Sequence, residues 1–144
     1  MNRLIVLGIF AFMMMMTACS DKPVTAEQLP APAKAFIEQA FPGQAITYVE
    51  KDTELTGSKY DVVLANGTRI DFDTDNVWDK LEGTMTAPIP TALIPEPIVA
   101  HLEANFPDAM VLKIDKESFG YEVELANGLE LKFNKQGVFT QMDD

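Results

Sequence analysis

The feature that most constrains the fold is a segment that occurs twice. Residues 60–72 read YDVVLANGTRIDF, and residues 121–133 read YEVELANGLELKF. In each copy Tyr, Val and Leu recur at every second position, which is typical of a half-buried antiparallel strand. Each copy continues with Asn-Gly, the strongest short signal for a β-hairpin. The chain is therefore predicted to form the same hairpin twice.

The similarity extends to both sides of the two hairpins. Residues 29–32 (LPAP) match residues 94–97 (IPEP), and the late pair Val77-Trp78 matches Val138-Phe139. The first copy has four extra residues, which we place in a polar loop over 52–59. A proline suits the first turn of a helix, and a later Phe-Pro pair ends it. Each copy therefore predicts one helix followed by four strands.

The repeats, together with the export signal described below, divide the chain into five segments. They are a signal peptide (1–18), a tether (19–28), a first repeat (29–82), a linker (83–93) and a second repeat (94–144). One repeat has about 50 residues, near the size at which a lone core is marginal. The two repeats are thus expected to share a core or to join their sheets. The predicted fold class is α+β, with tandem helix-then-four-strand repeats and both helices on one face of an antiparallel sheet.

The first residues read as an export signal. Arg3 supplies positive charge, and Leu4 to Met16 is an apolar run, shorter than the roughly 20 residues of a membrane span. Residues 16–19 (MTAC) resemble a bacterial lipobox, which implies cleavage before Cys19 and lipid on its sulfur. The alternative is an unlipidated cysteine left in the signal. We predict an exported protein that is lipid-anchored to the bacterial cell envelope.

The net charge narrows the choice of partners. The chain has 22 acidic and 11 basic residues, a formal charge of -11. Nucleic acid needs a basic face, so it is excluded as a partner class. The acidic surface also disfavours direct binding to anionic lipid, which leaves the acyl chain as the expected link to a membrane.

The motifs together resemble a known family. They are Leu/Ile-Pro-x-Pro, Phe-Pro-Gly/Asp, Tyr-x-Val-x-Leu-Ala-Asn-Gly, and a later Phe followed by Val and an aromatic residue. In two copies from Leu29 onward, they resemble the putative beta-lactamase-inhibitor-like, PepSY-like family. The resemblance implies tandem helix-plus-sheet units that bind a protein or peptide with a sheet face. It also implies an exported protein of a Gram-negative bacterium, anchored in the periplasm or at the outer membrane. It does not by itself imply inhibition of a lactamase.

One segment carries the ligand spacing of a calcium loop. DFDTDNVWDKLE, residues 71–82, places acids at positions 1, 3, 5, 9 and 12, as an EF-hand does. Its flanks read as strands, however, and the aligned segment KFNKQGVFTQMD (132–143) lacks nearly every ligand. We therefore predict a hairpin turn and no metal. Calcium binding is kept as the alternative, with Asp71, Asp73, Asp75 and Glu82 as its ligands.

No catalytic site or cofactor is predicted. The sole histidine, His101, falls on the second predicted helix, and no nucleophile, base and acid form a recognisable pattern. If Val77 and Val138 point toward the helices, strand alternation turns Trp78 and Phe139 to the other face, with Tyr48. These three aromatic residues are the predicted partner-binding patch. The alternative is that the rings cover one another or pack under the linker.

Overall fold

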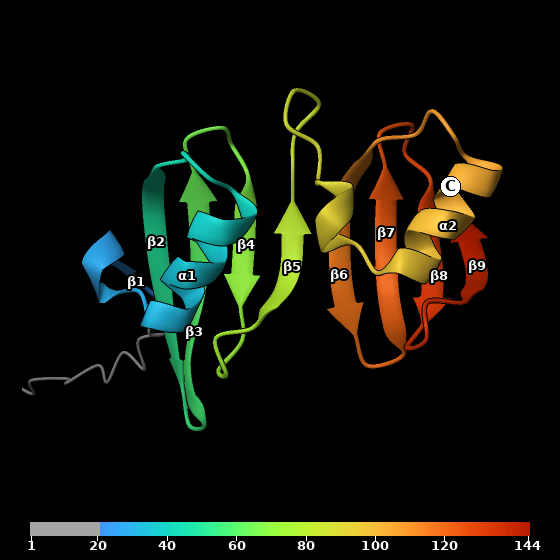
Figure 1. The fold of residues 1–144 in the computed structure, drawn as a ribbon. Coiled ribbons are helices and arrows are strands. Elements are labelled where there is room, and N and C mark those ends of the chain that lie inside the picture. Colours follow the sequence, from blue (N-terminus) through green and yellow to red (C-terminus); the bar gives the residue numbers. More distant parts are fainter. Residues whose placement is uncertain (1–20) are drawn as a thin grey trace, which may run out of the picture.

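The computed structural model describes residues 21–144, so the predicted signal peptide and Cys19 lie outside the described residues. Two α-helices and nine strands form the fold (Figure 1). In chain order the elements are β1 (Lys22–Val24), η1 (Ala26–Gln28), α1 (Ala31–Ala40), β2 (Ile46–Glu54), β3 (Gly57–Leu64), β4 (Arg69–Phe72), β5 (Trp78–Glu82), η2 (Thr91–Leu93), α2 (Glu96–Asn105), β6 (Val111–Glu117), β7 (Gly120–Leu125), β8 (Glu130–Asn134) and β9 (Phe139–Asp143). The two η elements are single 3₁₀ turns.

All nine strands form one sheet in which every pair is antiparallel and the order follows the chain from β1 to β9. The pairing of β5 with β6 joins the two halves, with Lys80 opposite Asp115 and Leu81 opposite Ile114. The sequence left open whether the halves join their sheets, and the structure shows that they do.

Both α-helices lie on the same face of the sheet (Figure 1). Each has a proline at the start of its first turn, where the missing N–H needs no partner. Each ends at a phenylalanine before a proline: the backbone N–H of Phe41 donates to Ile37, and that of Phe106 donates to Leu102. These helices supply the covering layer of the core.

The core lies between the helices and the sheet. The helices contribute Ala33, Ile37, Ile98 and Leu102, each at most 7% exposed. The two hairpins contribute the residues expected to face the helices: Tyr60, Val62, Leu64, Ile70 and Phe72 in the first half, and Val123, Leu125, Leu131 and Phe133 in the second. The repeated apolar pattern therefore marks the buried face of the sheet correctly.

Two segments differ from the prediction. Residues 22–28 of the predicted tether belong to the fold, because β1 pairs with β2 and Lys22 lies opposite Lys51. The expected polar loop 52–59 is mostly strand, since β2 runs to Glu54 and β3 begins at Gly57. Edge strands and exposed hairpins bury few side chains, so their hydrophobic signal is weak.

Candidate functional site

The face of the sheet opposite the helices carries two lateral rows of mostly polar side chains. The central row consists of directly paired residues of β2 to β9: Glu50, Asp61, Asp71, Lys80, Asp115, Glu122, Lys132 and Gln141. The second row, beside it, consists of Tyr48, Val63, Arg69, Glu82, Lys113, Glu124, Glu130 and Asp143. Both alternate along the strands with buried, helix-facing residues such as Val62 and Ile70. We call this surface the open face.

Like charges lie opposite each other at the first half of the central row. Asp61 is the cross-strand partner of both Glu50 and Asp71. Burial raises the pKa of Asp71, and the charge of Asp61 raises it further, to about 6, although Lys80 acts to lower it. Burial also raises the pKa of Asp61. The sheet thus holds carboxylates that repel one another at neutral pH.

Asp115 is the most buried member of the two rows, at 7% exposure. Its Oδ2 lies 3.3 Å from Nζ of Lys113. Its Oδ1 is buried and has no hydrogen-bond partner among residues 21–144. Most buried carboxylate oxygens do have a donor, so this atom requires an explanation.

Of the three predicted aromatic binding residues, only Tyr48 lies on the open face. It pairs with Val63, is 42% exposed, and donates a 2.7 Å hydrogen bond from Oη to Glu50 Oε2. The bond to Glu50 raises the pKa of the Tyr48 hydroxyl. Tyr48 is therefore an accessible aromatic residue beside the acidic run.

Trp78 was expected to point away from the helices, and this prediction is wrong. A bulge in β5 leaves Asp79 without a partner, so Trp78 pairs with the buried Phe72 instead. The ring then packs against the core from the helix side. Lys116 Nζ lies 3.8 Å from the ring centroid, a cation–π contact.

The predicted position of Phe139 is wrong for the same reason. A bulge at Thr140 pairs Phe139 with the buried Phe133. The Phe139 ring stacks on the imidazole of His101 in α2, with centroids 4.7 Å apart and planes 11° apart. Trp78 and Phe139 therefore face the helices, and the structure does not bring the predicted patch together. The same contact gives His101 a packing role against two rings, Phe133 and Phe139.

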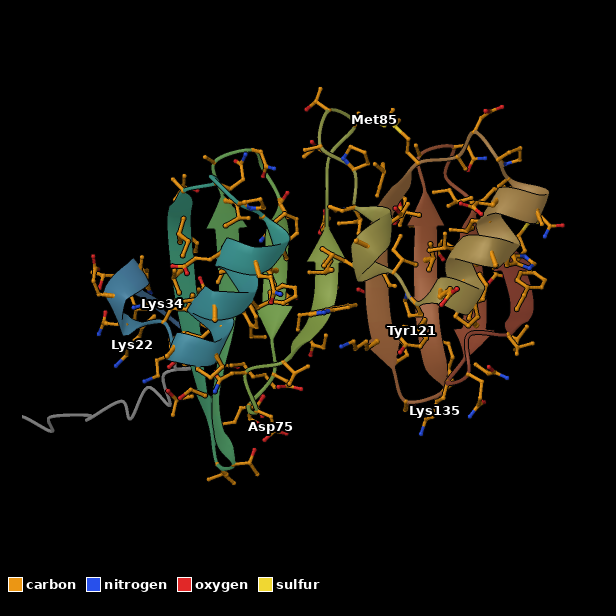
Figure 2. All side chains as sticks on the ribbon, viewed as in Figure 1. Lys22, Lys34, Asp75, Met85, Tyr121 and Lys135 are labelled. Carbon is orange, nitrogen blue, oxygen red and sulfur yellow. The ribbon has the colours of Figure 1, made fainter. Side chains whose placement is uncertain are left out.

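The turn proposed for calcium is closed by its own carboxylate. Asp73 Oδ1 accepts hydrogen bonds from the backbone N–H groups of Asp75 and Val77, at 2.9 and 3.0 Å. In the second half, Asn134 Oδ1 accepts the same two bonds from Gln136 and Val138. Asp75 projects at the tip of the turn (Figure 2). The neutral Asn134 therefore closes the equivalent turn with the same hydrogen bonds. This assigns Asp73 a structural role that does not need its charge.

The four candidate calcium ligands do not converge. Asp71 pairs across the sheet with Lys80, and Glu82 pairs with Arg69 farther along the strands. Within residues 21–144, no three His, Cys, Asp or Glu side chains are grouped to hold a metal ion. The acid spacing of the sequence therefore does not produce a calcium loop in the part of the chain that the structure describes.

Cys19, the predicted lipidation site, lies outside the described residues. Over residues 21–144, no helix is long and apolar enough to cross a membrane. Sequence reasoning missed the two charged residues that stand out in the structure, Asp71 as a repelled carboxylate and Asp115 as a buried one. Period-two alternation places both on the polar side, but only the strand register shows what lies opposite them.

Comparison with solved structures identifies similar proteins. A protein from Bacteroides vulgatus, described as a putative periplasmic protein of the DUF2874 family, is 34% identical with a TM-score of 0.80, covering 88% of this chain and 99% of its own. A putative calcium-regulated periplasmic protein from Bacteroides thetaiotaomicron is 32% identical with a TM-score of 0.78, covering 86% and 97%. A second B. vulgatus protein, described as a putative periplasmic protein of unknown function, is 28% identical with a TM-score of 0.79, covering 86% of this chain and 99% of its own.

No curated protein matches the chain. The model of one protein family matches residues 14–57 and 58–141, which together span most of the sequence. The chain therefore belongs to the family described as putative beta-lactamase-inhibitor-like, PepSY-like.

Proposed function

We propose that this protein is an exported, non-enzymatic module that binds a protein or peptide partner across the open face of its sheet. The observation that carries the proposal is the sheet itself. Within residues 21–144, nine strands form one continuous surface, with both α-helices on one face and no α-helix on the other (Figure 1). A sheet whose polar face is not covered by the described residues is a suitable platform for a partner of matching shape and charge.

The comparisons support the cellular location and the class of function. The three similar structures are described as putative periplasmic proteins, in keeping with an exported chain. The family description is inhibitor-like, which favours binding over catalysis. Fold alone does not fix an activity, so the partner has to be found by experiment.

A photo-crosslinking experiment tests the open face. A photoreactive phenylalanine analogue replaces Tyr48, which is exposed on the open face, or Gln39, which is exposed on α1. After illumination of intact cells, we expect a defined adduct with another protein from the Tyr48 site and none from the Gln39 site. Adducts from Gln39 alone would place the partner on the helices and contradict the proposal.

We also propose that Cys19 carries a lipid anchor. The observation that supports this proposal is an apolar segment, residues 4–16, followed closely by the single cysteine of the sequence, Cys19. In cells expressing the full chain, Cys19→Ser is expected to move the protein from the membrane fraction to the soluble fraction. Mass spectrometry of the wild-type N-terminal peptide should show an acylated Cys19. An unmodified cysteine at that position would contradict the anchor.

A further inference from the structure

The open face has an excess of acidic side chains. The central row and the second row together contain nine acidic and four basic side chains. The acids are Glu50, Asp61, Asp71, Asp115 and Glu122 in the central row, and Glu82, Glu124, Glu130 and Asp143 in the second row. A surface with one excess sign attracts partners of the opposite sign and repels others.

The fold does not require the acid that makes the repulsion strongest. Asp71 lies opposite Asp61, and directly opposed like charges destabilise a sheet. In the second half, the residue opposite Glu122 is Lys132, which occupies the position equivalent to Asp71. The second half thus accepts a lysine where the first half has an aspartate. The run Glu50–Asp61–Asp71 is therefore a property of the surface rather than a need of the hairpin.

Asp115 provides an independent observation on the same face. It lies in β6, between Lys80 of β5 and Glu122 of β7, and its Oδ1 is buried with no donor among the described residues. Lys113 contacts only the other oxygen, Oδ2. A buried carboxylate oxygen is stabilised when an N–H donor reaches it, most strongly a cationic one. Because this oxygen is buried, a donor from a partner reaches it only when the side chains that cover it move aside.

We infer that the open face binds a basic, extended segment of a partner protein, with its lysine or arginine side chains on Asp115 and on the run Glu50–Asp61–Asp71. This inference rests on the proposed function for the location of the binding surface. It adds the chemical class of the partner, which the proposed function leaves undefined.

The strand spacing sets the distance between cations in such a segment. Asp61 and Asp115 are three strands apart in the central row. At about 4.8 Å per strand their backbones are roughly 14 Å apart. An extended peptide rises about 3.3 Å per residue and alternates its side chains, so residues four apart lie on one side and span about 13 Å. Basic residues at every fourth position match both acidic points at once.

A synthetic peptide tests this inference on the purified folded part, residues 21–144. The probe is an extended threonine–valine peptide with lysine at every fourth position, and the control probe has glutamate at those positions. Binding is followed by titration calorimetry and by amide chemical shifts of the ¹⁵N-labelled protein. We expect the lysine peptide to bind, with shifts in β3, β4 and β6, and to bind more weakly as salt is added. The glutamate peptide should not bind.

Three variants locate the contact. Asp115→Asn keeps the side-chain shape and removes the charge, and Asp71→Lys installs the residue found at the equivalent position of the second half. Each is expected to raise the dissociation constant of the lysine peptide about tenfold. Glu38→Lys, on the exposed side of α1, makes the same charge change as Asp71→Lys and should change it less than about twofold. Urea unfolding of each variant shows that it is folded.

The outcomes separate this inference from the proposed function. Equal loss of binding in Glu38→Lys means that only net charge matters, and overturns the inference. If calcium alone shifts the same amide signals, and Asp115→Asn abolishes these shifts, the ligand of the open face is a metal ion and the inference of a basic peptide is wrong. If the lysine peptide fails to bind while crosslinking from Tyr48 still captures a protein, the cationic class is wrong and the proposed function stands. If both fail, both are wrong.

Discussion

Asp61 of β3 and Asp71 of β4 are cross-strand partners on the open face. Each is an acid whose pKa is raised by burial, and the charge on Asp61 raises the pKa of Asp71 to about 6. The equivalent partners in the second half, Glu122 and Lys132, have opposite charges. The two halves therefore share a backbone pattern but differ in the electrostatic cost of their central hairpins.

Removing the charge of Asp71 should stabilise the fold at neutral pH. Its folded pKa of about 6 lies above the ordinary value of 3.8, so the folded state holds the proton more tightly than the unfolded state. The contribution of Asp71 to the free energy of unfolding therefore falls as pH rises from about 4 to 6, and it stays reduced above that range. After a discount for solvent screening, Asp71→Asn should raise the free energy of unfolding by about 1–2 kcal/mol at pH 7.5, and by almost nothing near pH 4.

Urea denaturation at several pH values, followed by circular dichroism, measures this effect. Burial likewise raises the pKa of Asp79, which lies near Asp71, and Lys80 partly offsets the repulsion. The residues Asp79 and Lys80 are both kept in the Asp71→Asn variant. Asp75→Asn, at the exposed tip of the next turn, is the matched control and should leave stability unchanged at every pH. A gain from Asp71→Asn that persists undiminished at pH 4 would contradict the electrostatic explanation.

The turn after β4 should depend on an oxygen acceptor and not on a charge. Asp73 Oδ1 accepts two backbone hydrogen bonds, as Asn134 Oδ1 does in the second half. Asp73→Asn is therefore expected to keep the stability within about 0.5 kcal/mol, whereas Asp73→Ala loses both bonds and about 1–2 kcal/mol. Thermal unfolding with and without calcium accompanies the series. A midpoint that calcium raises in the wild type but not in Asp73→Asn would restore the metal role.

The repeat predicts the α+β class, the two Asn-Gly turns and the buried face of both hairpins, because these depend on local alternation and on Asn-Gly. It does not predict the short turn between β2 and β3, which was expected to be a longer polar loop. It does not predict the faces of Trp78 and Phe139. The bulges at Asp79 and Thr140 each insert one unpaired residue, which reverses the alternation beyond them. Thr140 Oγ1 donates a hydrogen bond to the Lys132 carbonyl across the bulge. Threonine is so common in strands, however, that its presence in the sequence does not predict a bulge. Alternation counted back from Leu81 or Met142 therefore puts Trp78 and Phe139 on the wrong face.

The acidic rows are only partly predictable. Alternation places Asp61, Glu122 and Glu124 on the polar side of their strands. Register between strands of different halves has no local signal, because β5 and β6 are separated by the linker and α2. The pairing of Lys80 with Asp115, and so the position of the buried Oδ1, follows only from the joined sheet.

The three aromatic residues first considered for binding should separate into two classes. Trp78 packs against the core and under Lys116, and Phe139 stacks on His101. Trp78→Ala should lower the free energy of unfolding by about 2–3 kcal/mol and Phe139→Ala by about 1–2 kcal/mol. Tyr48→Ala, on the open face, should cost less than about 0.5 kcal/mol. Urea denaturation followed by circular dichroism ranks the three, and a Trp78→Ala cost as small as that of Tyr48→Ala would contradict the helix-side position of the ring.

Two glycines at equivalent hairpins should respond very differently to alanine. Gly57 and Gly120 each begin the return strand of a two-residue turn, with φ of +143° and +149°. A Cβ on Gly57 would lie 3.3 Å from the Thr74 Cβ, whereas one on Gly120 would lie 2.1 Å from the Phe133 backbone oxygen. The backbone of β8 cannot move aside without breaking its pairing with β7.

Gly120→Ala is therefore expected to lower the free energy of unfolding by more than about 3 kcal/mol, and Gly57→Ala by about 1 kcal/mol, mostly from the unfavourable φ. Because both substitutions change the entropy of the unfolded chain equally, the difference between them isolates the clash in the folded sheet. Urea titration of the two variants in parallel measures that difference. Equal losses would mean that β7 and β8 separate freely at this end, and that the close packing of the second hairpin does not hold the sheet together.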